Sequence, residues 1–334
     1  MQYVSTFPAG FEKIIDRYMT TNKRGDYTID NIEPGFVLYT SNISQSKVLH
    51  RPVFTNTFSV VAKLGKMSSL NQIATKISGS LRQIRPVEDG KTTTFKLLVL
   101  NENTPTAIAD NDKVRSMLAK QLKLRHVSHH PDCEVIILRR HNSQAYILLR
   151  PDSYIPQYSK NQKGALSEST ASLLCVTSKL QKNETVLDPF AGYGAIPFAC
   201  ATYFQPKKVI ALEKDPLLAN QLRSLLPEKC RAYKQDVMTL RAENKLFRPH
   251  TIDRIITDPP WGQHDTATNI AAVYQSLARL SDTALRKYGV VTVLTSQPSI
   301  LEESFRSYRM FSKKQSLSVL ISGKKATVVT FQKS

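Results

Sequence analysis

The 334-residue sequence has little of several features that would place it in a particular class of protein. No apolar run reaches the 18 or so residues that a membrane-spanning helix needs. The first residues do not combine a cationic start with an apolar core, as a secretory signal does. The four cysteines form no C-x-x-C pair, so we expect neither a disulfide framework nor a metal site. We expect a cytoplasmic (or nuclear) protein without a membrane segment.

Acidic residues are also scarce, with 27 Asp and Glu against 46 Lys and Arg, a formal charge of +19. Both halves of the chain share this excess: residues 1–163 carry 23 basic and 13 acidic residues, and residues 164–334 carry 23 and 14. This distribution indicates a broad basic surface and not a basic tail. It favours a polyanionic partner, and charge that serves solubility alone is the plainer alternative.

The length predicts two domains. Apolar periodicity predicts a mixed α+β first half, with strands over 2–6, 35–40, 58–64 and 95–100, a hairpin over 134–149, and helices over 11–19, 71–81 and 112–124. A polar stretch, 153–164, is the best linker candidate. Beyond it strands and helices alternate, with strands over 185–188, 208–213, 232–235, 252–257, 290–295, 316–321 and 326–331 and helices over 169–180, 196–203, 216–226, 269–287 and 299–306. This alternation predicts an α/β domain with a mostly parallel, seven-stranded, Rossmann-like sheet ending in a hairpin.

The first turn of the alternating region has the pattern of a cofactor site. Gly192 and Gly194 follow a strand and open a helix, where glycine permits a sharp turn and a close ligand. Pro197 replaces the third glycine of a dinucleotide fingerprint. Glu213 ends the next strand at a spacing that suits ribose hydroxyls, and Asp236 ends the third. The expected cofactor-binding residues are Asp188, Pro189, Phe190, Ala191, Gly192, Gly194, Glu213, Lys214, Asp236 and Asp258.

A second turn, Asp258-Pro259-Pro260-Trp261-Gly262, follows the apolar strand 252–257. The prolines fix φ and remove two backbone donors, which leaves the Pro259 carbonyl and the Asp258 carboxylate as acceptors for an exocyclic NH2. Trp261 offers a face on which a base can stack. A Pro-Pro turn that caps a helix, with Trp261 in the core, is the alternative. We predict Asp258, Pro259, Pro260 and Trp261 as the catalytic set, acting on a nucleobase amine with S-adenosylmethionine as methyl donor.

These two motifs resemble those of the class I amino-methyltransferases, D-x-F-x-G-x-G followed by [D/N/S]-P-P-[Y/F/W]. The first half, on Phe7–Glu12 (F-P-A-G-F-E) and on residues 132–135, resembles the ferredoxin-like plus THUMP module of tRNA methyltransferases. The resemblance implies N2-methylation of a guanosine in tRNA, with 1–152 gripping the RNA and 165–334 as the methyltransferase domain. It also implies a candidate partner, because some relatives need a small zinc-binding activator subunit.

The helix over 112–124 and the residues after it carry the cations that we predict to contact RNA, namely Lys113, Arg115, Lys120, Lys123 and Arg125. Two other functions stay open at this point. Adenine also presents an exocyclic amine, so DNA or rRNA adenine-N6 methylation is one alternative. An RNA-binding protein with an inactive methyltransferase fold is the other, although the intact residues Gly192, Gly194, Asp258 and Pro259 oppose it.

Overall fold

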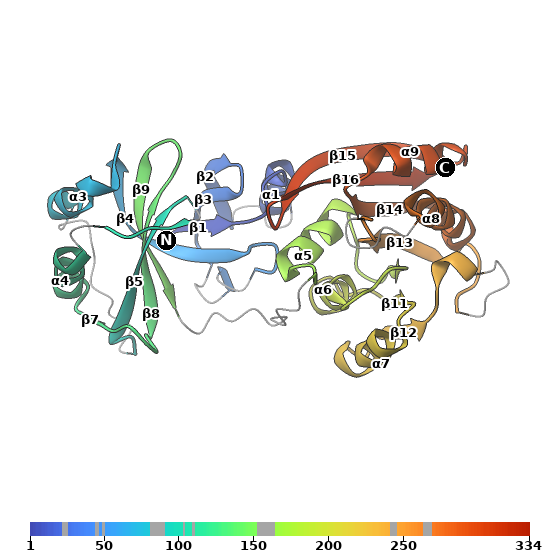
Figure 1. The fold of residues 1–334 in the computed structure, drawn as a ribbon, viewed down its shortest axis with the longest axis horizontal. Helices are drawn as coiled ribbons and strands as arrows, with labels where there is room; N and C mark the ends of the chain where they lie inside the picture. Colours follow the sequence, from blue (N-terminus) through green and yellow to red (C-terminus); the bar gives the residue numbers. More distant parts are fainter. Residues whose placement is uncertain are drawn as a thin grey trace.

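The computed structural model describes residues 1–21, 26–43, 47–48, 51–80, 91–102, 104–108, 111–151, 164–240, 246–262 and 269–334 (Figure 1). The described residues form two sheets, one in each half of an elongated molecule. The expected linker 153–164 lies outside the described residues except for Gly164, so the domain boundary stays a prediction.

The first half is built on one mixed sheet with the strand order β2-β3-β1-β4-β9-β8-β5-β6, and β7 pairs with β5. Its strands are β1 (Gln2–Thr6), β2 (Tyr27–Glu33), β3 (Phe36–Ser41), β4 (Asn56–Lys66), β5 (Thr94–Asn101), β6 (Thr104–Pro105), β7 (Arg125–His126), β8 (Cys133–Arg139) and β9 (Gln144–Pro151). Its helices are α1 (Glu12–Thr21), α3 (Ile73–Ser80) and α4 (Asn111–Leu122), and α3 and α4 share an apolar core with β4, β5, β8 and β9.

The predicted strands and the hairpin of this half are confirmed, whereas β2, β6 and β7 were not predicted from the sequence. β2 is an edge strand without a fully buried residue, so it lacks the apolar alternation that reveals a half-buried strand. Because β4 pairs with β9, the whole half is one continuous sheet. Its division into ferredoxin-like and THUMP-like parts stays a prediction.

The second half contains the predicted seven strands among the described residues, in the order β12-β11-β10-β13-β14-β16-β15. They are β10 (Thr185–Asp188), β11 (Lys208–Glu213), β12 (Cys230–Lys234), β13 (Ile252–Thr257), β14 (Leu285–Thr295), β15 (Phe311–Ile321) and β16 (Lys324–Lys333). The first five are parallel, whereas β16 and β15 form the expected antiparallel hairpin, so the sheet is mixed.

Helices cover both faces of this sheet, as the alternation of the strands requires. Val186 of β10 belongs to a core shared with α5 (Glu168–Thr177) and α6 (Ala195–Tyr203). Its neighbour Leu187 faces the core of α8 (Ile270–Ala284) and α9 (Pro298–Arg306), and α7 (Pro216–Leu225) packs beside β12. The predicted helix 269–287 was too long: Leu285 has an extended backbone, is buried and begins β14.

The two halves are joined by a shared apolar core. α1 contributes Ile14 and Ile15 to the cluster that holds α5, α6 and the β15–β16 hairpin. Backbone bonding continues across the joint, since the Leu320 N–H donates to the Ala9 carbonyl at 2.9 Å. Ser169 and Thr55 also share a hydroxyl hydrogen bond of 3.1 Å. α1 therefore belongs structurally to both halves.

Candidate functional site

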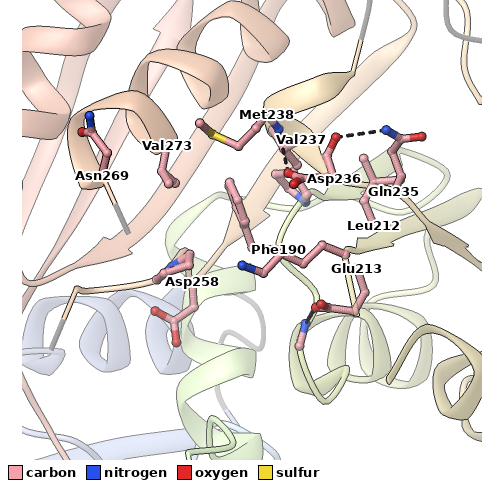
Figure 2. Close-up of a pocket in the computed structure, with 14 residues that line it drawn as sticks. Phe190, Leu212, Glu213, Gln235, Asp236, Val237, Met238, Asp258, Asn269 and Val273 are labelled. Atoms are coloured by element: carbon pink, nitrogen blue, oxygen red, sulfur yellow. Dashed lines mark hydrogen bonds between the residues drawn. The ribbon is translucent and has the colours of Figure 1, made fainter. Parts of the chain in front are cut away.

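A cavity of about 400 Å³ lies at the carboxyl ends of the parallel strands. Its walls come from the residues that follow β10, β11, β12 and β13 and from the first turn of α8. In open α/β sheets this end of the strands is where ligands bind, because the loops diverge there. Figure 2 shows Asp258 on one side of the cavity and Glu213 on another, with Phe190 near its centre.

The turn after β10 is fastened to the end of β11. Glu213 accepts the Gly192 N–H at 2.8 Å through one carboxylate oxygen and the Asp215 N–H at 2.9 Å through the other. The Ala191 N–H donates to the Leu212 carbonyl at 2.9 Å. Gly192 has φ 52°, a left-handed conformation that glycine adopts without strain. Glu213 thus shapes the turn and still has lone pairs for hydroxyl donors of a ligand.

Most of the predicted cofactor residues line this cavity, namely Pro189, Phe190, Gly192, Glu213, Lys214, Asp236 and Asp258. Asp188, Ala191 and Gly194 are not among the lining residues. Ala191 is buried below the turn. Gly194 has φ 89°, and a Cβ there would stand 2.5 Å from Leu222 Cδ2. Glycine at this position therefore allows α7 to pack close to the turn, and it does not make room for a ligand.

Asp188 ends β10, directly before the cavity-lining Pro189, and is fully buried. The Thr257 hydroxyl donates to its Oδ1 at 2.7 Å, and the Phe190 N–H donates at 3.2 Å. Within the described part of the chain its Oδ2 has no hydrogen-bond partner. Burial raises the pKa of Asp188 to about 7, although the two hydrogen bonds lower it. A buried acceptor without a partner is costly, so this oxygen suits a donor from a bound ligand.

The structure adds an apolar slot and an amide that the sequence analysis missed. Leu212, Val237, Met238 and Val273 line the cavity together with Phe190, and Met238 remains 39% exposed. Asn269 caps α8, its Oδ1 accepting the Ala272 N–H at 3.1 Å, and also lines the cavity. The sequence signals were the apolar pair after Asp236 and an Asn before a helix. Apolar side chains of this kind suit the faces of an adenine ring.

The second turn places Asp258 at the cavity and turns Trp261 away from it. Asp258 and Pro260 line the cavity, whereas Pro259 is buried. The Trp261 indole N–H donates to Asp258 Oδ1 at 2.8 Å, and the ring packs against the core that joins the two halves. Burial raises the pKa of Asp258 to about 7, and the bond from Trp261 opposes that rise. Base stacking on Trp261 stays a prediction. The hydrogen bond from its indole N–H to Asp258 was not expected from the sequence.

The cations predicted to contact RNA lie on α4 and just after it. Lys113, Lys120, Lys123 and Arg125 are exposed, and Arg115 pairs with Asp112 at 3.1 Å. Figure 1 places α4 at the opposite end of the molecule from the sheet that bears the cavity.

The described residues contain neither a helix suited to span a membrane nor a side-chain cluster suited to a metal ion. No helix there combines the length and apolar character needed to cross a lipid bilayer. No cluster of three or more His, Cys, Asp or Glu side chains suited to a metal ion occurs in the same part of the chain.

Comparisons with known proteins agree with this geometry. Residues 169–319 match the family of the TRM5/TYW2 methyltransferase domain. No curated protein matches the chain. The chain resembles TrmN from Thermus thermophilus, with a TM-score of 0.79, 19% identity, and coverage of 100% of this chain and 99% of that one.

Two further solved structures share the fold. The protein SMU.472, solved in complex with SAH, has a TM-score of 0.72 at 12% identity, covering 100% of this chain and 98% of its own. A predicted N6-adenine-specific DNA methylase from Listeria monocytogenes has a TM-score of 0.69 at 14% identity, covering 98% and 95%. The family match spans the cavity, whose carboxylates and apolar slot fit an adenosine. The chain is therefore a methyltransferase whose cofactor is S-adenosylmethionine.

Proposed function

We propose that this methyltransferase modifies the exocyclic N2 of a guanosine in tRNA. The observation that supports this best is the Asp258 carboxylate, held at the cavity wall by a turn whose two prolines lack N–H groups. A site that offers only hydrogen-bond acceptors suits a substrate group that donates hydrogen bonds. An exocyclic amine is such a group, because it has two N–H bonds.

The chemistry follows from the two oxygens of Asp258. Oδ1 accepts the Trp261 N–H, which leaves Oδ2 for one hydrogen of the amine. The Pro259 carbonyl is the second acceptor, and binding both hydrogens localises the nitrogen lone pair in one direction. After methyl transfer the nitrogen carries an extra proton. A carboxylate with a pKa of about 7 can receive this proton at neutral pH and return it to water.

The cofactor supplies an electrophilic methyl group on a sulfonium when bound. Glu213 has the position and spare lone pairs to accept from ribose hydroxyls. Asp236, whose Oδ1 accepts the Met238 N–H at 2.9 Å, stands beside the apolar slot and suits the adenine edge. Asp188 Oδ2 offers an acceptor below the turn. These residues orient the cofactor, and such orientation lowers a barrier by several kcal/mol in general.

Charge and shape favour RNA as the substrate. The net charge of +19 is spread over both halves, and phosphate contacts from Lys and Arg give affinity without reading sequence. An RNA that touches α4 and also enters the cavity must extend along the molecule's long axis. A folded RNA with an unpaired end meets that requirement, since a base must leave its stack to reach such a site. A small activator subunit stays a candidate partner.

The test is methyl transfer by the purified chain from labelled S-adenosylmethionine to tRNA, rRNA and duplex DNA, followed by mass spectrometry of the nucleosides. We expect N2-methylguanosine in tRNA, and no transfer by Asp258→Ala. N6-methyladenosine in rRNA or DNA would replace the proposed substrate with adenine. If the chain binds cofactor but methylates none of the three, the proposed reaction is wrong.

A further inference from the structure

Trp261 contacts the Asp258 turn through the N–H edge of its ring. Its ring packs against the apolar cluster shared by α1, α5, α6 and the β15–β16 hairpin, and it is not among the residues that line the cavity. Its N–H edge is the part that meets the catalytic turn, at 2.8 Å from Asp258 Oδ1. The contact joins a partly buried ring, packed against the apolar cluster, to the carboxylate that lines the cavity.

We propose that Trp261 is a positioning residue, whose indole N–H fixes the Asp258 carboxylate so that Oδ2 alone is presented to the substrate amine. This inference rests on the proposed function, because it assigns Asp258 to the amine. It differs from the stacking role that the sequence suggests for the same side chain.

The backbone around Trp261 holds the indole in this arrangement. Pro259 and Pro260 fix two φ angles between the donor and the acceptor, so little freedom remains in the intervening turn. On the other side, Gly262 has φ 73°, and a Cβ there would stand 2.8 Å from Ile270 Cγ1 of α8. The end of the turn at Gly262 therefore packs closely against α8. A ring fixed by this turn and by the apolar cluster loses little entropy when it holds a carboxylate.

The bond also affects the charge of Asp258. Asp188 from β10 and Tyr274 from α8 are electrostatically coupled to Asp258, while Glu213, Lys214 and Asp236 line the same cavity. Burial raises the pKa of Asp258 to about 7, and the Trp261 N–H lowers it. A donor to the ionised form favours that form. Trp261 thus helps to keep Asp258 an acceptor at neutral pH.

The first experiment needs no substrate, because it measures tryptophan fluorescence. Trp261 is the single tryptophan of the chain, so this signal reports on Trp261 alone. Its fluorescence, followed in the full-length protein against pH, should show an inflexion near pH 7 as Asp258 ionises. Asp258→Asn keeps an oxygen for the indole N–H but cannot ionise, so this inflexion should vanish. Asp188→Asn is the matched control, and the inflexion should remain there. No inflexion in the wild type, or the same inflexion in Asp258→Asn, would overturn the proposal.

The second experiment measures methyl transfer to tRNA against pH. Trp261→Phe keeps an aromatic ring but lacks the N–H, so the pH at half-maximal kcat should rise by about one unit. The kcat reached at high pH should also fall, because the ionised carboxylate is no longer held in one orientation. In the Asp258→Asn background Trp261→Phe should leave the pH profile unchanged, because no carboxylate remains there to titrate. A raised KM for tRNA with an unchanged pH profile would show stacking instead. If the wild type fails to methylate tRNA, the proposed function falls and the fluorescence titration still decides the contact.

Discussion

Replacing Glu213 by Ala tests the cofactor site most directly, because this carboxylate has two roles. It accepts N–H groups from Gly192 and Asp215, and it faces the cavity. Loss of a charge-assisted hydrogen bond to ribose costs about 1.5–3 kcal/mol. At 1.4 kcal/mol for each tenfold change, the Kd for S-adenosylmethionine should rise by about tenfold to a hundredfold.

The same change should also lower the stability of the protein without ligand. The Gly192 N–H is partly buried and loses its acceptor, at a cost of about 1–3 kcal/mol. The Asp215 N–H is exposed and finds water instead. For a domain of this size, such a loss corresponds to a fall in Tm of several degrees, at about 2–4 °C for each kcal/mol.

The matched control is Asp215→Ala, two residues away. Asp215 Oδ1 caps α7 by accepting the N–H groups of Leu217 and Leu218 at 2.7 and 3.1 Å, and its side chain is not among the residues that line the cavity. This variant should lose about 1 kcal/mol of stability and keep its cofactor affinity. Calorimetry with the cofactor and thermal unfolding measure both effects. If Glu213→Ala binds as tightly as wild type, or Asp215→Ala binds as weakly as Glu213→Ala, the assignment of Glu213 is wrong.

Three other outcomes are expected. Gly194→Ala should lose more than about 1 kcal/mol of stability by thermal unfolding, since φ is 89° and the new Cβ meets Leu222; an unchanged Tm would contradict this. In wild type kcat should rise with pH through about 7 and then level, because a carboxyl with a raised pKa is a protonated donor below that pH; a flat profile from pH 5 to about 9 would count against Asp258. Binding to tRNA, measured by filter retention, should weaken steeply with salt, and a salt-independent affinity would exclude phosphate contacts.

The sequence predicted the central strands of the second half well because most of their residues are buried. β10, β11 and β13 lie at the expected residues, since continuous apolar runs between polar turns leave few other choices. The carboxylates Glu213, Asp236 and Asp258 line one cavity, because parallel strands end at the same edge of the sheet. The residues at the end of each strand can be identified from the local sequence alone. The order of the strands along the chain then indicates that these ends lie at one edge of the sheet.

The parts that the sequence did not predict depend on packing between distant segments. Gly194 has the same spacing as a ligand-facing glycine, but its Cβ position is occupied by Leu222 from the next helix. Trp261 is four residues past the end of β13, yet its ring belongs to a core that includes α1. Neither neighbour can be read from local spacing, because each contact joins elements that meet only in the folded chain.

The joint between the two halves bears on the proposed path of RNA to the cavity. At Gly10, with φ 100°, a Cβ would stand 2.1 Å from the Ser318 carbonyl of β15, so backbone meets backbone there. The Ala9 carbonyl accepts from Leu320 in the same strand, and α1 completes the core behind it. Contacts of this kind allow little rotation, since packed interfaces shift between discrete states and do not bend continuously. If the proposed function is right, RNA that contacts α4 would meet Asp258 across a joint with little freedom to rotate, and the distance between them would select for an RNA of fitting length.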